Sequence, residues 1–91
     1  MMYEIIYSPK AIDDLRLLKR SEPASFKKVA KFIEELKVHP KTGTGHPEQL
    51  KGDRSGQWSR KITKKHRLIY EIFDDKVYVD VLSAFGHYDD K

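Results

Sequence analysis

Apolar residues in the first part of the chain recur at the spacing of a short strand and then of a helix. Residues 3–7 are aromatic and β-branched, which predicts a strand that stops at Ser8 and Pro9. Ser8 can cap a helix whose first residue is Pro9, because the missing N–H of proline costs nothing at that position. The next apolar residues, Ile12, Leu15 and Leu18, predict one apolar stripe on this helix.

A second amphipathic helix is predicted after a break at residues 21–23, where Ser, Glu and Pro interrupt the pattern. It ends by His39, because the residue before Pro40 is disfavoured in a helix. Lysine and glutamate side chains fill the opposite side of this helix. Its apolar face consists of Phe26, Val29, Ala30, Ile33 and Leu36.

Beyond a loop at residues 41–49, the pattern changes from helical to extended. Segments 58–63, 66–73 and 77–84 are rich in β-branched and aromatic residues, and their short connections predict an antiparallel meander. The predicted fold class is α+β in the order β-α-α-β-β-β. Two helices pack on one face of an antiparallel sheet, and the first strand joins its edge or its middle. The aromatic residues expected in the core are Trp58, Tyr70, Phe73 and Tyr78.

The chain has 91 residues, of which 38% are hydrophobic and 35% charged, so we assign residues 1–91 to a single domain. This composition excludes a collagen-like, coiled-coil, disordered or membrane-spanning protein. The sequence contains no cysteine, which excludes a disulfide framework, a thiolate metal site and a cysteine nucleophile. The first residues lack the basic start and long apolar run of a secretion signal, which predicts a cytoplasmic protein.

The formal net charge of +4 is distributed unevenly along the chain. Residues 51–67 contain seven Lys and Arg residues and one Asp, so this stretch carries +6 while the rest of the chain sums to −2. Such a concentration of positive charge is expected where a protein binds a phosphate backbone. The alternative is a solvated basic sheet edge that discourages aggregation. The basic residues are Lys51, Arg54, Arg60, Lys61, Lys64, Lys65 and Arg67.

The glycine-rich stretch from Gly43 to Glu48 is not a phosphate-binding loop. It lacks the P-loop lysine motif, and Glu48 stands where a dinucleotide fingerprint needs its third glycine. We interpret its glycines as a sharp backbone turn that places Glu48 just ahead of the basic segment. The histidines and acidic residues show none of the usual ligand spacings, so no metal and no cofactor is predicted.

The combination of a carboxylate, several cations and a C-terminal histidine is suited to RNA cleavage without a metal. RNA carries its own nucleophile, the 2′-hydroxyl, so the protein must supply a base, cations for the phosphate and an acid for the leaving 5′-oxygen. Glu48 is the candidate base and His87 the candidate acid, since histidine can donate a proton near neutral pH. Chemistry alone leaves this as one assignment among many, because a histidine near a C-terminus is more often a surface residue. The candidate phosphate clamp consists of Arg67, Lys51 and Lys61, and Tyr88 is the candidate for positioning or stacking the substrate.

Several motifs together resemble one known family. They are G-x-G-H-P-E at residues 43–48, S-G-Q-W-S-R at residues 55–60, H-R-L-I-Y at residues 66–70 and the C-terminal pair His87-Tyr88. On these motifs the chain resembles the YoeB/Txe toxins of the RelE-like superfamily of toxin-antitoxin modules, over essentially its whole length. The resemblance implies the RelE-like microbial ribonuclease-type fold.

The same resemblance implies a type II toxin that cuts mRNA in the ribosomal A site and so blocks translation. It also implies that a YefM-like antitoxin neutralises the toxin, that the toxin forms a homodimer, and that toxin and antitoxin together repress their operator DNA. Matched by position, Glu48 falls on the family's catalytic glutamate and Arg67 on its phosphate-contacting arginine. Lys51 matches the lysine after the catalytic loop, and His87 and Tyr88 match the family's terminal pair.

The sequence departs from the family pattern at two places. Lys61 stands where the family often has arginine, which keeps the charge but loses the bidentate fork of a guanidinium. Residues 89–91 follow Tyr88, although the His-Tyr pair is commonly terminal. Two other functions are alternatives. One is a ParE-like toxin of the same fold that acts on DNA gyrase without RNase chemistry, and the other is a basic protein that blocks translation sterically.

Overall fold

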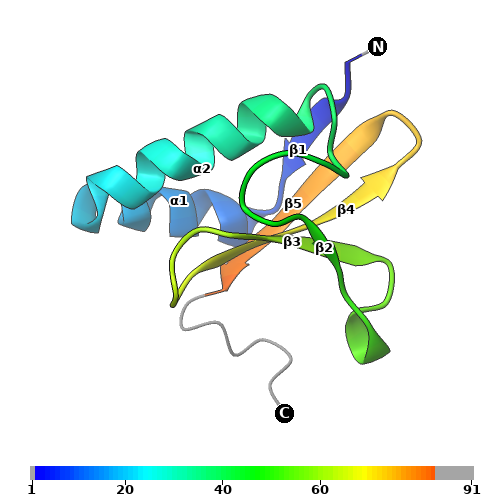
Figure 1. The fold of residues 1–91 in the computed structure, drawn as a ribbon. Coiled ribbons are helices and arrows are strands. Elements are labelled where there is room, and N and C mark those ends of the chain that lie inside the picture. Colours follow the sequence, from blue (N-terminus) through cyan, green and yellow to red (C-terminus); the bar gives the residue numbers. More distant parts are fainter. Residues whose placement is uncertain (1, 84–91) are drawn as a thin grey trace.

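The computed structural model describes residues 2–83, with the side chains of residues 54 and 80–83 excepted. Its elements follow the predicted order, with one short strand added at the end of the loop (Figure 1). In chain order they are β1 (Glu4–Tyr7), α1 (Pro9–Ser21), α2 (Pro23–Leu36), β2 (Glu48–Gln49), the 3₁₀ helix η1 (Gly52–Arg54), β3 (Gln57–Lys61), β4 (Arg67–Phe73) and β5 (Lys76–Ser83).

The strands form one five-stranded sheet in the order β1-β5-β4-β3-β2. β2 to β5 are antiparallel neighbours, whereas β1 runs parallel to β5 at one edge. A parallel pair needs a crossover connection, and the two helices between β1 and the rest of the sheet provide one. Both helices lie on the same side of the sheet (Figure 1). The α+β class and the packing of two helices on one face are therefore confirmed. The prediction of an antiparallel sheet was wrong for its edge, because β1 joins the sheet parallel to β5.

The helix boundaries follow the signals in the sequence. The Ser8 hydroxyl caps α1 by accepting a hydrogen bond from the Ala11 N–H at 3.0 Å. Pro23 opens α2 directly after Glu22, whose N–H donates to the Leu18 carbonyl at 2.7 Å and so closes the end of α1. The predicted break at residues 21–23 therefore separates the helices by a single residue.

The core lies between the helices and the face of the sheet that they cover. The sheet contributes alternate residues to it, because successive side chains of a strand point to opposite faces. Phe73 and Tyr78 depart from the expectation that they are core residues, since 49% and 41% of their surfaces are exposed. The fully buried apolar residues of this core are Ala11, Phe32, Leu36, Ile62, Leu68, Tyr70, Val77 and Val79. Ile69 is fully buried as well but stands on the other face of the sheet.

Neither helix in the described part of the chain is long and apolar enough to cross a membrane.

Candidate active site

Three of the candidate site residues stand on one face of the sheet. Glu48 in β2 pairs with Ser59 in β3, and Lys61, two residues further along β3, pairs with Arg67 in β4. Paired residues and residues two apart share a face. The intervening residues, such as Arg60, point to the helices. We call the face away from the helices the open face.

The spacing of the open-face residues suits one phosphate group. Glu48 and Arg67 are separated by β3 and by one step of two residues, which places their Cα atoms roughly 12 Å apart. The backbone of Lys61 lies between them in the sheet. The side chains of Glu48 and Lys61 are exposed, and that of Arg67 is half-buried. A carboxylate and two cations of this length can converge on a group held above the strands.

Lys51 lies on the opposite side of Glu48 from Lys61. The Leu50 N–H donates to the Gln57 carbonyl at 2.8 Å, so the chain at Leu50 runs beside the beginning of β3, whereas Lys61 ends that strand. Lys51 is exposed and immediately precedes η1. The structure thus places cations on both sides of Glu48. His87 and Tyr88 lie outside the described residues, and their roles stay predictions.

Arg60 does not belong to the accessible basic patch, although the sequence analysis counted it there. Its side chain is fully buried on the helix side of β3. The guanidinium forms an ion pair with the Glu35 carboxylate of α2, and its Nε donates to the Tyr70 hydroxyl at 3.2 Å. The remaining N–H groups donate to the carbonyls of His39 at 3.1 Å, Thr42 at 2.7 Å and Thr44 at 3.3 Å.

These bonds hold the loop that leads into Glu48. Thr44 donates to Glu35 from its N–H at 3.0 Å and from its hydroxyl at 2.8 Å. The Tyr70 hydroxyl donates to the Pro40 carbonyl at 2.8 Å. Burial raises the pKa of Glu35, but the hydrogen bonds from Thr44 and Arg60 outweigh it and hold that pKa below its usual range. Glu35 is therefore charged at neutral pH and fixes the loop together with Arg60.

The two glycines of this loop allow it to pack closely against α2. Gly43 and Gly45 have φ of 120° and 80°, a region that other residues rarely adopt. A Cβ atom at Gly45 would collide with the Phe32 ring, and one at Gly43 would collide with the Glu35 carboxylate. The interpretation of the glycines as a tight turn, rather than a phosphate-binding loop, agrees with this geometry.

Ser59 lies within the candidate site, although the sequence did not single it out as a functional residue. It lies between Glu48 and Ile69 in one row across the open face. Its side chain is fully buried, and its hydroxyl has no hydrogen-bond partner among the described residues. Ser59 belongs to the S-G-Q-W-S-R motif, but only the register places it beside Glu48.

A further contact anchors the turn between β3 and β4. His66, which precedes Arg67, lies with its Nε2 at 3.1 Å from a carboxylate oxygen of Glu22 at the junction of the helices. Hydrogen bonds from His66 and Ser25 lower the pKa of Glu22. Within the turn, the Thr63 hydroxyl accepts from the N–H groups of Lys65 and His66, both at 3.1 Å. The turn that carries Lys61 and Arg67 is thus tied to the helices.

Among the described residues, no group of three or more His, Asp and Glu side chains could hold a metal ion. Whether the chemistry proceeds without a metal stays a prediction.

Comparison with known proteins gives one consistent family. A family model for the YoeB-like toxin of bacterial type II toxin-antitoxin systems matches residues 7–88. The toxin YoeB of Mycobacterium bovis is 34% identical over 87 residues, which cover 96% of this chain and 100% of that protein. The solved structure of a YoeB/ParE toxin from Agrobacterium tumefaciens superimposes with a TM-score of 0.84 at 30% identity, covering 89% of this chain and 96% of that one.

Solved structures of YoeB from Staphylococcus aureus share the fold as well. The dimer of that protein superimposes with a TM-score of 0.80, and its heterotetrameric complex with the antitoxin YefM with a TM-score of 0.78. In both, the identity is 26%, and the match covers 91% of this chain and 97% of that chain.

Proposed function

Because this chain belongs to the family of YoeB-like toxins of bacterial type II toxin-antitoxin systems, we propose that it is a metal-independent endoribonuclease that cleaves mRNA in the ribosomal A site. The observation that carries the proposal is the shared face of Glu48, Lys61 and Arg67, which are far apart in the chain. A base and two cations on one open face match the needs of cleavage by the 2′-hydroxyl of RNA.

In this mechanism Glu48 accepts the proton of the 2′-hydroxyl, and the 2′-oxygen attacks the neighbouring phosphorus. Negative charge then builds on the phosphate oxygens. Arg67 can bind two of these oxygens through its planar guanidinium, while Lys61 and Lys51 act as point charges. His87 protonates the departing 5′-oxygen, and Tyr88 positions the substrate. The products are a 2′,3′-cyclic phosphate and a free 5′-hydroxyl.

The end of β5 supports the assignment of His87. Ser83, the last residue of this strand, pairs with Arg67. His87 follows four residues later in the sequence, and four residues reach at most about 14 Å when extended. β5 therefore ends beside Arg67, and four residues are long enough for His87 to reach a phosphate held there.

We also infer the partners and the compartment from the family. The S. aureus relative forms a dimer and a complex with YefM, which supports a homodimer and a YefM-like antitoxin for this chain. We propose that the toxin acts in the cytoplasm and that the complex with antitoxin binds operator DNA.

The proposal predicts that Glu48→Ala and Arg67→Ala each lower the rate of mRNA cleavage on ribosomes by roughly a hundredfold or more. Cleavage by the wild type should persist in EDTA and leave 2′,3′-cyclic phosphate ends. Mapping of mRNA ends on stalled ribosomes measures both. Lys28→Ala is the matched control, because Lys28 is exposed on α2 and outside the open face.

Undiminished cleavage by both variants would refute the assignment of these residues. Inhibited translation with full-length mRNA would instead indicate steric blocking. Gyrase-dependent poisoning with intact RNA would indicate the ParE-like alternative.

A further inference from the structure

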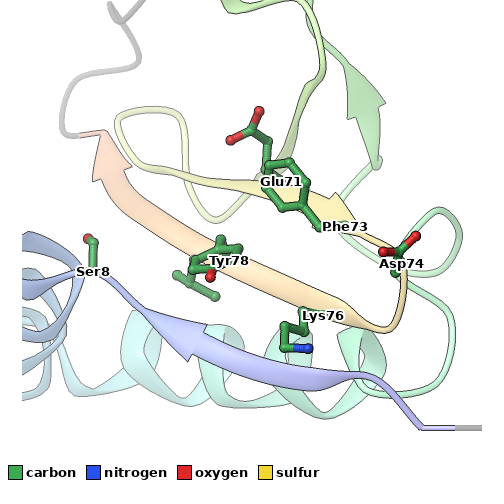
Figure 2. A pocket seen from close by; sticks show the side chains of 7 residues that line it. Ser8, Glu71, Phe73, Asp74, Lys76 and Tyr78 are labelled. Carbon is green, nitrogen blue, oxygen red and sulfur yellow. The ribbon is translucent and has the colours of Figure 1, made fainter.

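The open face carries a pocket away from the candidate active site, at the hairpin between β4 and β5. Its volume is about 550 Å³. Figure 2 shows Glu71 and Phe73 on β4 and Tyr78 on β5 around it. The full lining consists of Ser8, Glu71, Phe73, Asp74, Lys76, Tyr78 and Val79. A pocket of this size suits a small ligand or a single residue of a polymer.

Two aromatic rings are open to this pocket. Phe73 and Tyr78 expose 49% and 41% of their surfaces, and their ring centroids lie 5.5 Å apart in an edge-to-face arrangement. Exposed aromatic rings on a sheet are the platforms on which proteins stack the unpaired bases of single-stranded RNA. The arrangement leaves ring surface available to a planar guest.

The charges of the pocket favour a base rather than a phosphate. Glu71 and Asp74 contribute two carboxylates against the single ammonium of Lys76, which already lies 3.4 Å from the Asp75 carboxylate. This excess of negative charge repels phosphate groups. A carboxylate can, however, accept a hydrogen bond from the exocyclic amino group of a base.

The pocket and Arg67 lie on the same face of β4, with the fully buried Ile69 between them. Arg67, Ile69, Glu71 and Phe73 alternate onto the open face, and Glu71 pairs with Tyr78 across the hairpin. Phe73 lies six residues from Arg67, or about 20 Å along the strand. An RNA strand whose phosphate is bound by Lys61 and Arg67 can therefore continue along β4 with its bases toward the pocket.

We propose that this pocket binds one nucleobase of the same RNA strand, stacked on one of the Phe73 and Tyr78 rings with its edge against the other, and with the exocyclic amino group of the base donating to Glu71. The proposal rests on the proposed function. It implies a preference for cytosine, adenine or guanine over uracil, which has no amino group. A second copy of the chain fits the pocket less well, because a symmetric contact would place the carboxylates of Glu71 and Asp74 against their own counterparts.

The test measures the affinity of short single-stranded 2′-O-methyl RNAs by fluorescence anisotropy, because blocking the 2′-hydroxyl prevents cleavage. Phe73→Ala and Tyr78→Ala should each weaken binding of an oligocytidine roughly tenfold. The slope of affinity against salt should not change, because stacking releases no counterions. Glu71→Gln should abolish the preference for oligocytidine over oligouridine, since an amide can also donate to the uracil O4.

Leu17→Ala is the control, because Leu17 is 56% exposed on α1. If the aromatic variants bind as the wild type does, while Lys61→Ala weakens binding and flattens the salt slope, the pocket inference fails and the proposed function stands. If Lys61→Ala and Arg67→Ala also bind normally, the phosphate clamp itself fails. Loss of self-association in Phe73→Ala, seen by sedimentation with RNA affinity unchanged, would assign the pocket to a second copy and overturn the proposal.

Discussion

At the scale of single residues, neighbouring positions of β3 have opposite environments. Arg60 is buried and fully engaged on the helix side, whereas the buried hydroxyl of Ser59 on the open face has no partner among the described residues. A buried hydroxyl without a partner costs stability, and removing it recovers that cost. We therefore expect Ser59→Ala to leave the free energy of unfolding unchanged or to raise it by up to about 1 kcal/mol. Urea denaturation measures the change.

Ser25→Ala is the control for Ser59→Ala in the measurement of unfolding free energy. Ser25 is also buried, but its hydroxyl donates to Glu22 at 3.0 Å. Its removal should lower the free energy of unfolding by about 1 kcal/mol. If Ser59→Ala lowers stability as much as Ser25→Ala does, the hydroxyl of Ser59 has a partner in solution.

At the scale of elements, the loop between α2 and β2 depends on the Arg60 guanidinium. This group bonds to Glu35, to the Tyr70 hydroxyl and to several loop carbonyls, and lysine has too few donors to replace all of these bonds. We expect Arg60→Lys to lower the free energy of unfolding by roughly 2 kcal/mol or more. Hydrogen exchange of the Thr44 N–H should become faster, because its partner Glu35 loses the guanidinium that orients it.

Arg16→Lys is the matched control, because Arg16 is exposed on α1. It should change the free energy of unfolding by no more than about 0.5 kcal/mol. If Arg60→Lys and Arg16→Lys lower the free energy of unfolding equally, the buried hydrogen bonds of the Arg60 guanidinium do not hold the loop.

At the scale of the whole molecule, the sheet separates a helix-covered face from an open face that carries Lys61 and Arg67 of the proposed clamp. The clamp consists of Lys51, Lys61 and Arg67, and the burial of Arg60 leaves it unchanged. Three engaged cations predict a slope of about −2 for the logarithm of RNA affinity against the logarithm of salt concentration. Lys61→Ala should reduce the slope by about 0.7, and Lys28→Ala on α2 should not change it. An unchanged slope in Lys61→Ala would remove Lys61 from the clamp.

Local signals in the sequence were sufficient for much of the fold. Ser8 and Pro9 define the start of α1, Pro23 defines the start of α2, and the change of period after the loop predicts the strands. Glu48 and Arg67 were chosen as candidates from their residue types and from the family motifs, and their roles stay predictions. Each of these inferences depends on a residue and its near neighbours in the chain.

Only the tertiary structure decided which side each strand residue faces. Arg60 and Lys61 are consecutive cations in the sequence, yet one is buried against Glu35, 25 residues away in α2, and the other is exposed beside Arg67. The exposure of Phe73 and the position of Ser59 beside Glu48 depend on the same choice of face. That choice follows from where the helices pack and how the strands are registered, and these are contacts between residues that are distant in the chain.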